Sequence, residues 1–269
     1  MSRVAVVGLG LIGGSLALAL RARGWDRDAE TRHQARARGV DAPEALPEAV
    51  AGAEIVVAAV PTEETPALLI ALSQAAPKAI LTDTSSLKRP MLEAARNLRQ
   101  GVRFVGGHPM AGSEATGIAA ARPDLFRGRP WVFVSTPRSD EPAIAACEAL
   151  ARAAGARPVR LDATRHDRLM TWISHLPLAV AASLARAAQA ATGAELPELA
   201  GPGFLDTTRV AAQPVALALE LALADPGALA GAVDAVSKEL SGLAAALRRE
   251  DSEALQRFFQ EASDARRRV

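Results

Sequence analysis

The sequence predicts an α/β domain with a doubly wound parallel sheet over residues 1–161, followed by an all-helical domain over residues 162–269. Three observations predict this organisation. Short apolar runs alternate with helical stretches in the first half, as is typical of parallel strands buried on both faces. A glycine-rich turn joins the first strand to the first helix. From about residue 162 the pattern becomes helical and rich in Ala and Leu.

Six segments of the first half have the composition of buried strands. In chain order they are residues 3–7, 54–60, 79–82, 102–105, 131–135 and 158–161. In the second half, helix breaks are expected at Gly193, at residues 201–203 and at residues 225–227, where Gly and Pro gather. Ala-rich helical faces pack closely, so we expect this half to form a dimer interface.

Composition excludes several classes of function. The chain has 31 basic and 30 acidic residues, without the concentrated basic surplus of a nucleic-acid binder. The most apolar region, residues 215–230, is interrupted by Glu220 and Asp225, so no membrane span is expected. The single Cys147 excludes an internal disulfide and a cysteine-based metal cluster. With no signal peptide before the first strand, we expect a cytoplasmic protein.

The first strand runs directly into Gly8, Gly10 and Gly13, which form the pattern G-x-G-x-x-G. Such glycines allow a tight turn, and backbone amides of the loop and of the helix start, including those of Leu11 and Ile12, can approach a pyrophosphate. We therefore predict a dinucleotide site here.

The acid that binds the adenine ribose would follow the second strand, and Asp26 is the candidate. It lies only 13 positions after Gly13, so the intervening helix or strand must be clipped. A carboxylate here favours NAD, whereas Arg27 and Arg32 leave NADP open. The alternative for Asp26 is an ordinary turn residue.

Another strand end is expected to meet the same crevice. Val60, Pro61 and Thr62 follow the apolar run 54–60, and cofactors bind at the carboxyl ends of such strands. A helix N-cap is the alternative for Thr62.

Polar motifs follow two further strands and open the helical half. They are TDTSSLK at 82–88, GGHPMAGSEATG at 106–117, and the pair His166-Asp167 with SHLP at 174–177. Three of the four histidines lie in these segments, and Lys88 is one of only three lysines. A lysine at a strand end in an Arg-rich chain indicates a need for a compact ammonium group, although a surface lysine is the alternative.

In combination, these motifs resemble the prephenate and arogenate dehydrogenase family of tyrosine biosynthesis. The resemblance covers GLGLIGGS, the pattern D-x-x-S-x-K at Asp83, GGHPMAGSE, HD with SHLP, and the arginine of GFLDTTR. It implies a Rossmann-type domain with a helical dimerisation domain, NAD as cofactor and a homodimer. It also implies oxidative decarboxylation of prephenate to 4-hydroxyphenylpyruvate, or the same reaction of arogenate.

The resemblance also implies residue roles. His108 matches the catalytic base. Imidazole suits this role because its pKa lies near the working pH. Ser86 matches a serine that hydrogen-bonds the same substrate hydroxyl, with a helix N-cap as the alternative. Arg209 matches an arginine that binds a substrate carboxylate.

Further residues are assigned to the substrate on the same grounds, with open alternatives. Glu114 is expected near the pocket mouth or on the ordinary surface, and His175 is a substrate contact or a core histidine. Ser113 and Lys88 complete the set. His166 is expected to cap a helix or mark the domain junction. No pair of these histidines has a spacing that demands a metal.

Two departures from the family pattern bear on the substrate. Leu178 stands where many members have a second histidine after SHLP, and residues 210–219 lack the family's tryptophan. Arogenate dehydrogenase and a non-catalytic NAD-binding dimer therefore stay open as alternatives. A β-hydroxyacid-type dehydrogenase would need a catalytic lysine in the helical half, where only Lys238 is present.

Overall fold

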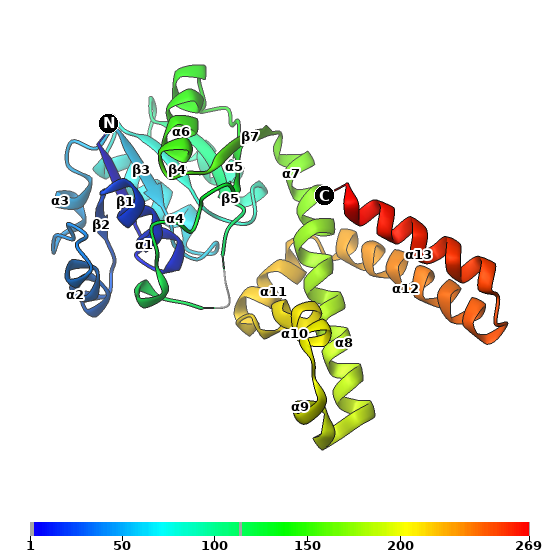
Figure 1. Cartoon of the computed structure of the whole chain (residues 1–269). Helices are drawn as coiled ribbons and strands as arrows, with labels where there is room; N and C mark the ends of the chain where they lie inside the picture. Colours follow the sequence, from blue (N-terminus) through cyan, green and yellow to red (C-terminus); the bar gives the residue numbers. More distant parts are fainter. Residues whose placement is uncertain (1–2, 113–114, 269) are drawn as a thin grey trace. The chain divides into compact units, whose positions relative to one another are not determined.

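The structure is a computed structural model that describes residues 3–112 and 115–268 (Figure 1). The chain forms two compact units, Met1–Asp167 and Arg168–Val269, which are described separately below. Helix α7 (Ala163–Met170) runs across this division. The domain boundary between residues 161 and 162 stays a prediction.

The first unit contains a seven-stranded sheet in the order β2-β1-β3-β4-β5-β6-β7. The strands are β1 (Val4–Val7), β2 (Arg23–Trp25), β3 (Ile55–Ala58), β4 (Ile80–Asp83), β5 (Arg103–Pro109), β6 (Pro130–Val134) and β7 (Arg157–Leu161). Each of the six apolar segments overlaps a strand, which confirms the predicted α/β class. The sheet order reverses between β1 and β3, and ligands of such sheets bind beside that reversal.

One neighbouring pair departs from the predicted parallel sheet. Strand β6 runs antiparallel to β5, while all other neighbours are parallel. The described part of the β5–β6 connection carries only the short 3-10 turn η1 (Ile118–Ala120). Parallel neighbours need a crossover, usually a helix, whereas an antiparallel neighbour needs only a loop.

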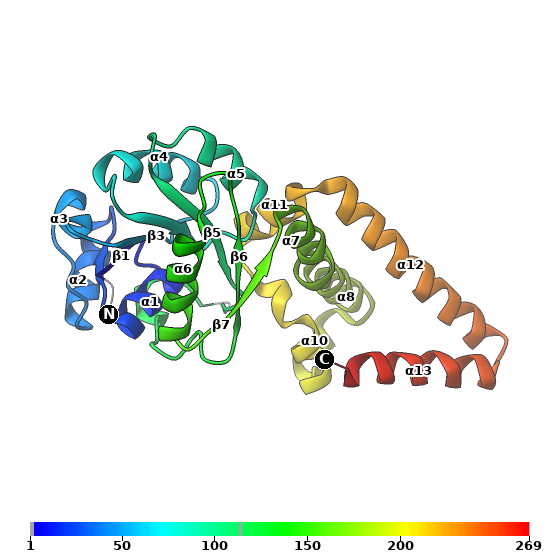
Figure 2. The same ribbon diagram turned by 90° about the horizontal axis from the view of Figure 1, so that it is seen from above.

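Helices cover both faces of this sheet (Figure 2). They are α1 (Leu11–Leu20), α2 (Ala29–Ala37), α3 (Leu46–Val50), α4 (Thr65–Ala75), α5 (Arg89–Arg96) and α6 (Glu141–Ala153). Successive strand residues point to opposite faces, so Val6 joins the α1 and α6 core whereas Ala5 and Val7 join the α4 and α5 core. This double burial explains why the strands have continuous apolar sequences.

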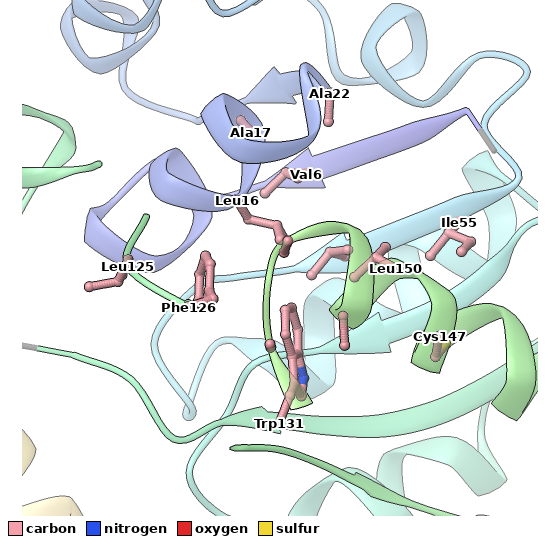
Figure 3. Packing of buried hydrophobic residues seen from close by; sticks show 14 of the residues in the cluster. Val6, Leu16, Ala17, Ala22, Ile55, Leu125, Phe126, Trp131, Cys147 and Leu150 are labelled. Atoms are coloured by element: carbon pink, nitrogen blue, oxygen red, sulfur yellow. The ribbon is translucent and has the colours of Figure 1, made fainter. Parts of the chain in front are cut away.

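An aromatic stack fills the core on the α1 and α6 side (Figure 3). Trp131 stacks between Phe126 and Phe133, with ring centroids 5.4 and 5.8 Å apart. Cys147 on α6 lies in the same core, and burial raises the pKa of its thiol to about 12. The only cysteine is therefore a neutral core residue at physiological pH.

The short spacing to Asp26 has a local cause. Helix α1 has only ten residues and ends at Arg21, which adopts a left-handed conformation with φ of 49°. Strand β2 then has only three residues. The predicted shortening is therefore found in both the helix α1 and the strand β2.

The second unit is helical, as predicted. Beyond the end of α7 it contains the π-helical turn η2 (Thr171–His175), α8 (Leu176–Thr192), η3 (Gly193–Glu195), α9 (Leu196–Leu199), α10 (Pro202–Thr208), η4 (Arg209–Ala212), α11 (Val215–Ala224), α12 (Pro226–Arg248) and α13 (Ser252–Arg267). The predicted breaks are confirmed: Gly193 ends α8, Gly201 precedes α10, and Asp225 caps α12 by accepting the Ala228 N–H.

Over the described residues, no single helix has the length and apolarity to cross a membrane. The pair α11 and α12 would pass that test together, but they are bent by 94° at their junction.

Candidate active site

The glycine loop between β1 and α1 has the geometry of a phosphate-binding turn. Gly8 has a φ of 97°, and a Cβ there would lie 2.4 Å from the carbonyl oxygen of Ala59. A Cβ on Gly13 would lie 1.8 Å from the carbonyl oxygen of Gly8. At Gly10, by contrast, no described protein atom lies within 4 Å of the position that a Cβ would occupy. The loop therefore packs on one side and leaves room at Gly10 for an outside group.

The start of α1 is suited to an anion. In this described loop no side chain caps the helix, and its first turn contains no acidic residue. The first amides of an uncapped helix need acceptors, and the helix dipole favours a negative one. The residues present therefore fit the pyrophosphate of a dinucleotide, with Gly10, Leu11 and Ile12 nearest to it.

Asp26 lies beside this loop, directly after β2. Its Oδ2 accepts the Leu9 N–H at 2.8 Å, and its Oδ1 accepts the Asp28 N–H at 3.0 Å. The structure thus brings Asp26 to the glycine loop, as expected for a ribose-binding acid. The helix cap of α2 is Asp28, which accepts from the Thr31 N–H.

The segment after β3 also reaches the glycine loop. A Cβ on Gly8 would lie 2.8 Å from a methyl group of Val60, so these two strand ends touch. Thr62 is buried, but α4 begins at Thr65 with Glu64 before it. The alternative that Thr62 caps α4 is therefore wrong, and its contact with a cofactor stays a prediction.

The two arginines that left NADP open are both held elsewhere. Arg27 makes two hydrogen bonds to Glu64, at 2.9 and 3.0 Å. Arg32 is buried and donates to Glu44 and to the carbonyl oxygens of Asp26 and Arg27. Neither guanidinium is thus presented for a 2′-phosphate, which favours NAD.

A substitution tests this reading of the adenosine side. Glu64→Ala should release Arg27 and tighten NADP binding several-fold, because an exposed ion pair contributes at most about 1 kcal/mol. Dissociation constants for NAD and NADP, measured by calorimetry, check this. Glu63→Ala, at the exposed neighbour, is the matched control and should change neither constant. An equal change for both cofactors in Glu64→Ala would contradict the assignment.

The motif TDTSSLK forms a buried clamp. Asp83 Oδ1 accepts the Gly107 N–H at 2.8 Å, and its Oδ2 accepts the Ser85 N–H and the Lys88 Nζ, the latter at 2.6 Å. Lys88 Nζ also donates to the carbonyl oxygen of Gly107. Both side chains are fully buried, and burial lowers the pKa of Lys88 while the Asp83 carboxylate opposes that shift.

This clamp corrects the assignment of Lys88 to the substrate. An ammonium group that is fully buried and held by Asp83 and Gly107 cannot contact a substrate carboxylate. Lys88 holds the carbonyl oxygen of Gly107 and Asp83 holds its N–H, and Gly107 is the residue before His108. A Cβ on Gly107 would lie 2.4 Å from the Asp83 carbonyl oxygen, so this strand contact requires glycine.

His108 lies near the end of β5 and is partly buried. Its Nδ1 lies 2.9 Å from Nε2 of His166, a fully buried residue of α7. The Nδ1 of His166 in turn lies 2.7 Å from Asp167 Oδ1. The ring of the candidate base is thus held by His166, and the Asp83–Lys88 clamp holds the backbone of the preceding residue, Gly107.

Asp167 links His166 to the segment that carries the Asp83–Lys88 clamp. Its two oxygens accept the main-chain N–H groups of Lys88 and Arg89, at 3.2 and 3.3 Å. Although burial alone would raise the pKa of Asp167, hydrogen bonds from His166 and from Lys88 N–H hold it below its usual value. Asp167 is therefore a carboxylate at neutral pH.

Ser86 is half-buried and lies in the loop between β4 and α5, two residues before Lys88. Helix α5 begins at Arg89 with Lys88 before it, so the alternative that Ser86 caps this helix is wrong. Ser113 and Glu114 lie outside the described residues.

The remaining predicted residues belong to the helical unit. His175 is buried at the end of the π-helical turn η2, followed by Pro177 in the first turn of α8. Because proline has no N–H to donate, the regular hydrogen-bond pattern cannot continue through this point. Arg209 begins η4 and is exposed. Their contacts with a substrate stay predictions.

Two comparisons with known proteins agree with this geometry. The family model described as "Prephenate dehydrogenase, nucleotide-binding domain" matches residues 16–160, and "Prephenate dehydrogenase, dimerization domain" matches residues 162–261. A prephenate dehydrogenase of Lactococcus lactis subsp. cremoris is 32% identical over 280 residues, covering 99% of this chain and 77% of the relative. The chain belongs to the prephenate dehydrogenase family. It is a dehydrogenase with a nucleotide-binding domain.

Solved structures of the family share the fold. The arogenate dehydrogenase of Synechocystis is 31% identical with a TM-score of 0.81, and each chain covers 99% of the other. A prephenate dehydrogenase of A. aeolicus, solved with hydroxyphenyl propionate and NAD+, is 26% identical with a TM-score of 0.88 and covers 100% of this chain and 98% of that one. The fold predicted from the sequence is therefore confirmed.

Sequence reasoning missed the partners of His108. His166 does lie at the junction of the two units, as one of its two predicted roles requires, whereas at the start of α7 it is Asp162 that accepts the Arg165 N–H. Asp167 received no role. The adjacency of His and Asp in a chain with only four histidines was the one available signal.

Proposed function

We propose that the chain catalyses the NAD-dependent oxidative decarboxylation of prephenate to 4-hydroxyphenylpyruvate in tyrosine biosynthesis. The observation that carries the proposal is His108 near the end of β5, whose ring contacts His166 and whose neighbour Gly107 is held by Asp83 and Lys88. Family membership supports the reaction type, and the glycine loop with Asp26 supports NAD.

His108 is the base for the C4 hydroxyl of the substrate. When bound, NAD accepts the hydride from C4. Accepting the hydroxyl proton makes that oxygen more electron-rich, which favours departure of the hydride. Loss of the ring carboxylate as CO₂ then leaves an aromatic ring, and the proton returns to the oxygen of the phenol. General-base assistance of this kind contributes on the order of 10²–10⁴ in rate.

Ser86 is proposed to hydrogen-bond the same hydroxyl. Its place in the loop that carries the Lys88 clamp supports this role. For Ser113, Glu114 and His175 the substrate role rests on the family resemblance alone.

Arg209 is proposed to bind a substrate carboxylate through its guanidinium fork. Arg209→Ala should raise the KM for prephenate by about ten-fold or more while kcat changes less, since binding is lost in ground and transition states alike. Steady-state kinetics with saturating NAD check this, with Arg186→Ala as the control. An unchanged KM with weaker NAD binding would contradict the placement.

The alternative substrate is arogenate, whose side chain carries an amino group in place of the keto group. Leu178 and the tryptophan-free residues 210–219 favour keeping it as a second candidate, because the family senses the side chain there. The solved arogenate dehydrogenase at 31% identity supports the same alternative.

The helical unit is proposed to form a homodimer in the cytoplasm. Its described residues bury few apolar side chains, and α13 buries none. Its exposed large apolar residues include Leu199, Leu205, Val215, Leu219, Leu223, Leu240, Leu247 and Phe259. Exposed apolar patches of this kind mark association surfaces, and the matched family model is a dimerization domain. Light scattering should give twice the chain mass, and a monomer would contradict the proposal.

The reaction itself is tested by stoichiometry. Incubation with prephenate and NAD should yield NADH, CO₂ and 4-hydroxyphenylpyruvate in equal amounts. NADH without CO₂ would show oxidation of another kind and would overturn the proposal.

A further inference from the structure

Three side chains from distant parts of the chain form one hydrogen-bonded series. His108 comes from β5, and His166 and Asp167 come from α7. The two imidazole rings meet edge to face, with centroids 5.2 Å apart, and the heavy-atom distances along the series are 2.9 and 2.7 Å. All three residues belong to the first compact unit.

The end of the series fixes where the protons lie. A carboxylate only accepts, so the proton between Asp167 and His166 is carried by His166 Nδ1. A neutral His166 then has its lone pair on Nε2, which faces His108. The hydrogen bond between the rings is therefore donated by His108 Nδ1, and the lone pair of His108 lies on Nε2.

We propose that His166 and Asp167 are positioning residues that hold His108 in the tautomer a base requires and stabilise its protonated form. The inference rests on the proposed function and adds two residues to it. His108 Nε2 takes the hydroxyl proton of the substrate, and the Nδ1 proton moves toward His166 Nε2. The positive charge is then shared with a ring that is bonded to a carboxylate. The proton returns by the same route when the phenol forms.

Asp167 is itself fixed by the loop that fixes Gly107. Its oxygens accept the N–H groups of Lys88 and Arg89, while Lys88 Nζ binds the Gly107 carbonyl oxygen. Gly107, which precedes His108, and the hydrogen-bonded series are thus anchored to the same short segment. Positioning by such a shared anchor limits rotation of the His108 ring.

Asp167→Asn tests the series directly. The amide is neutral and presents an N–H as well as an oxygen, so it no longer imposes a proton on His166 Nδ1. We expect kcat to fall about 100-fold or more, while the KM for prephenate and the dissociation constant of NAD stay within about twofold. Loss of the same carboxylate in a Ser–His–Asp triad costs roughly 10⁴ in kcat through the wrong tautomer.

The pH profile separates this role from a structural one. Among the described residues, the charged groups linked to the two rings are Asp167, which pairs with Arg89 at 3.5 Å, and the Asp83–Lys88 pair, which acts through Gly107. Asp167 favours the protonated pair of rings, so its loss should move the acidic limb of kcat/KM to lower pH. Asp162→Ala, which removes the acceptor at the start of α7 and leaves the series intact, should not move the limb.

His166 offers a graded pair of variants. In His166→Gln, the side-chain oxygen can still accept from His108 Nδ1, whereas His166→Ala leaves no acceptor there. We expect His166→Gln to retain at least ten times the kcat of His166→Ala. Equal kcat values for the two variants, with thermal stability matched, would overturn a positioning role.

A spectroscopic readout needs no substrate. In ¹⁵N-histidine-labelled protein, the ring nitrogen shifts of His108 should show the proton on Nδ1 in the wild type, and more proton on Nε2 in Asp167→Asn. A His108 ring with its proton on Nε2 in the wild type would overturn the inference. If the wild type fails to oxidise prephenate, the proposed function fails while this spectrum still decides the series.

Discussion

Replacing His108 with Asn should lower kcat by roughly 10²–10⁴, because general-base assistance of the hydroxyl proton is lost. The asparagine retains a hydrogen-bonding side chain near Nδ1, so the contact with His166 can persist while the proton acceptor at Nε2 is removed. The variant should bind NAD as tightly as the wild type, since the glycine loop and Asp26 are untouched. Stopped-flow absorbance of NADH at saturating substrate measures the loss.

The matched control for this variant is His33→Asn. His33 is an exposed residue of α2, so its substitution should leave kcat unchanged. Turnover of the His108 variant within threefold of the wild type would show that another group takes the proton.

Replacing Lys88 with Met should lower the free energy of unfolding by about 3–5 kcal/mol, because removal of one partner leaves a buried charge unpaired. The Asp83 carboxylate would keep only the Gly107 and Ser85 N–H groups. Chemical denaturation monitored by tryptophan fluorescence measures the change. Activity should fall as well, since Lys88 Nζ holds the carbonyl oxygen next to His108.

Two further variants make the Lys88 result specific. Lys78→Met, at an exposed lysine, should change stability by no more than about 0.5 kcal/mol. The double variant Lys88→Met with Asp83→Asn should recover part of the stability, because the remaining side chain is then neutral. A loss in Lys88→Met no larger than in Lys78→Met would contradict the buried ion pair.

The strands were predictable because buried strands can be recognised from their local amino-acid composition. Parallel strands covered on both faces need apolar side chains at every position, and runs such as residues 54–60 meet that need. The glycine loop was predictable because a Cβ at Gly8 or Gly13 would collide with nearby backbone atoms. The antiparallel direction of β6 could not be predicted, because it depends on the long β5–β6 connection, whose sequence has no helical pattern.

The candidate site was predictable only in part, because its contacts join residues far apart in the sequence. His108 and His166 are 58 positions apart, and no local pattern reports their hydrogen bond. The assignment of Lys88 to the substrate failed for a related reason. Lysines are almost always exposed, and its full burial depends on Asp83 and Gly107 meeting it from neighbouring strands. For the helical unit, the Ala-rich helical faces predict a dimer interface, and that prediction awaits its test.

We propose above that this chain oxidises prephenate with NAD. That proposal is tested most directly by initial rates of reduced-cofactor formation with prephenate and arogenate, each offered with NAD and with NADP. We expect the highest kcat/KM for prephenate with NAD. A higher value for arogenate would contradict the substrate assignment and direct attention to Leu178. No turnover with any of the four pairs, in a protein that binds NAD, would contradict the catalytic account itself.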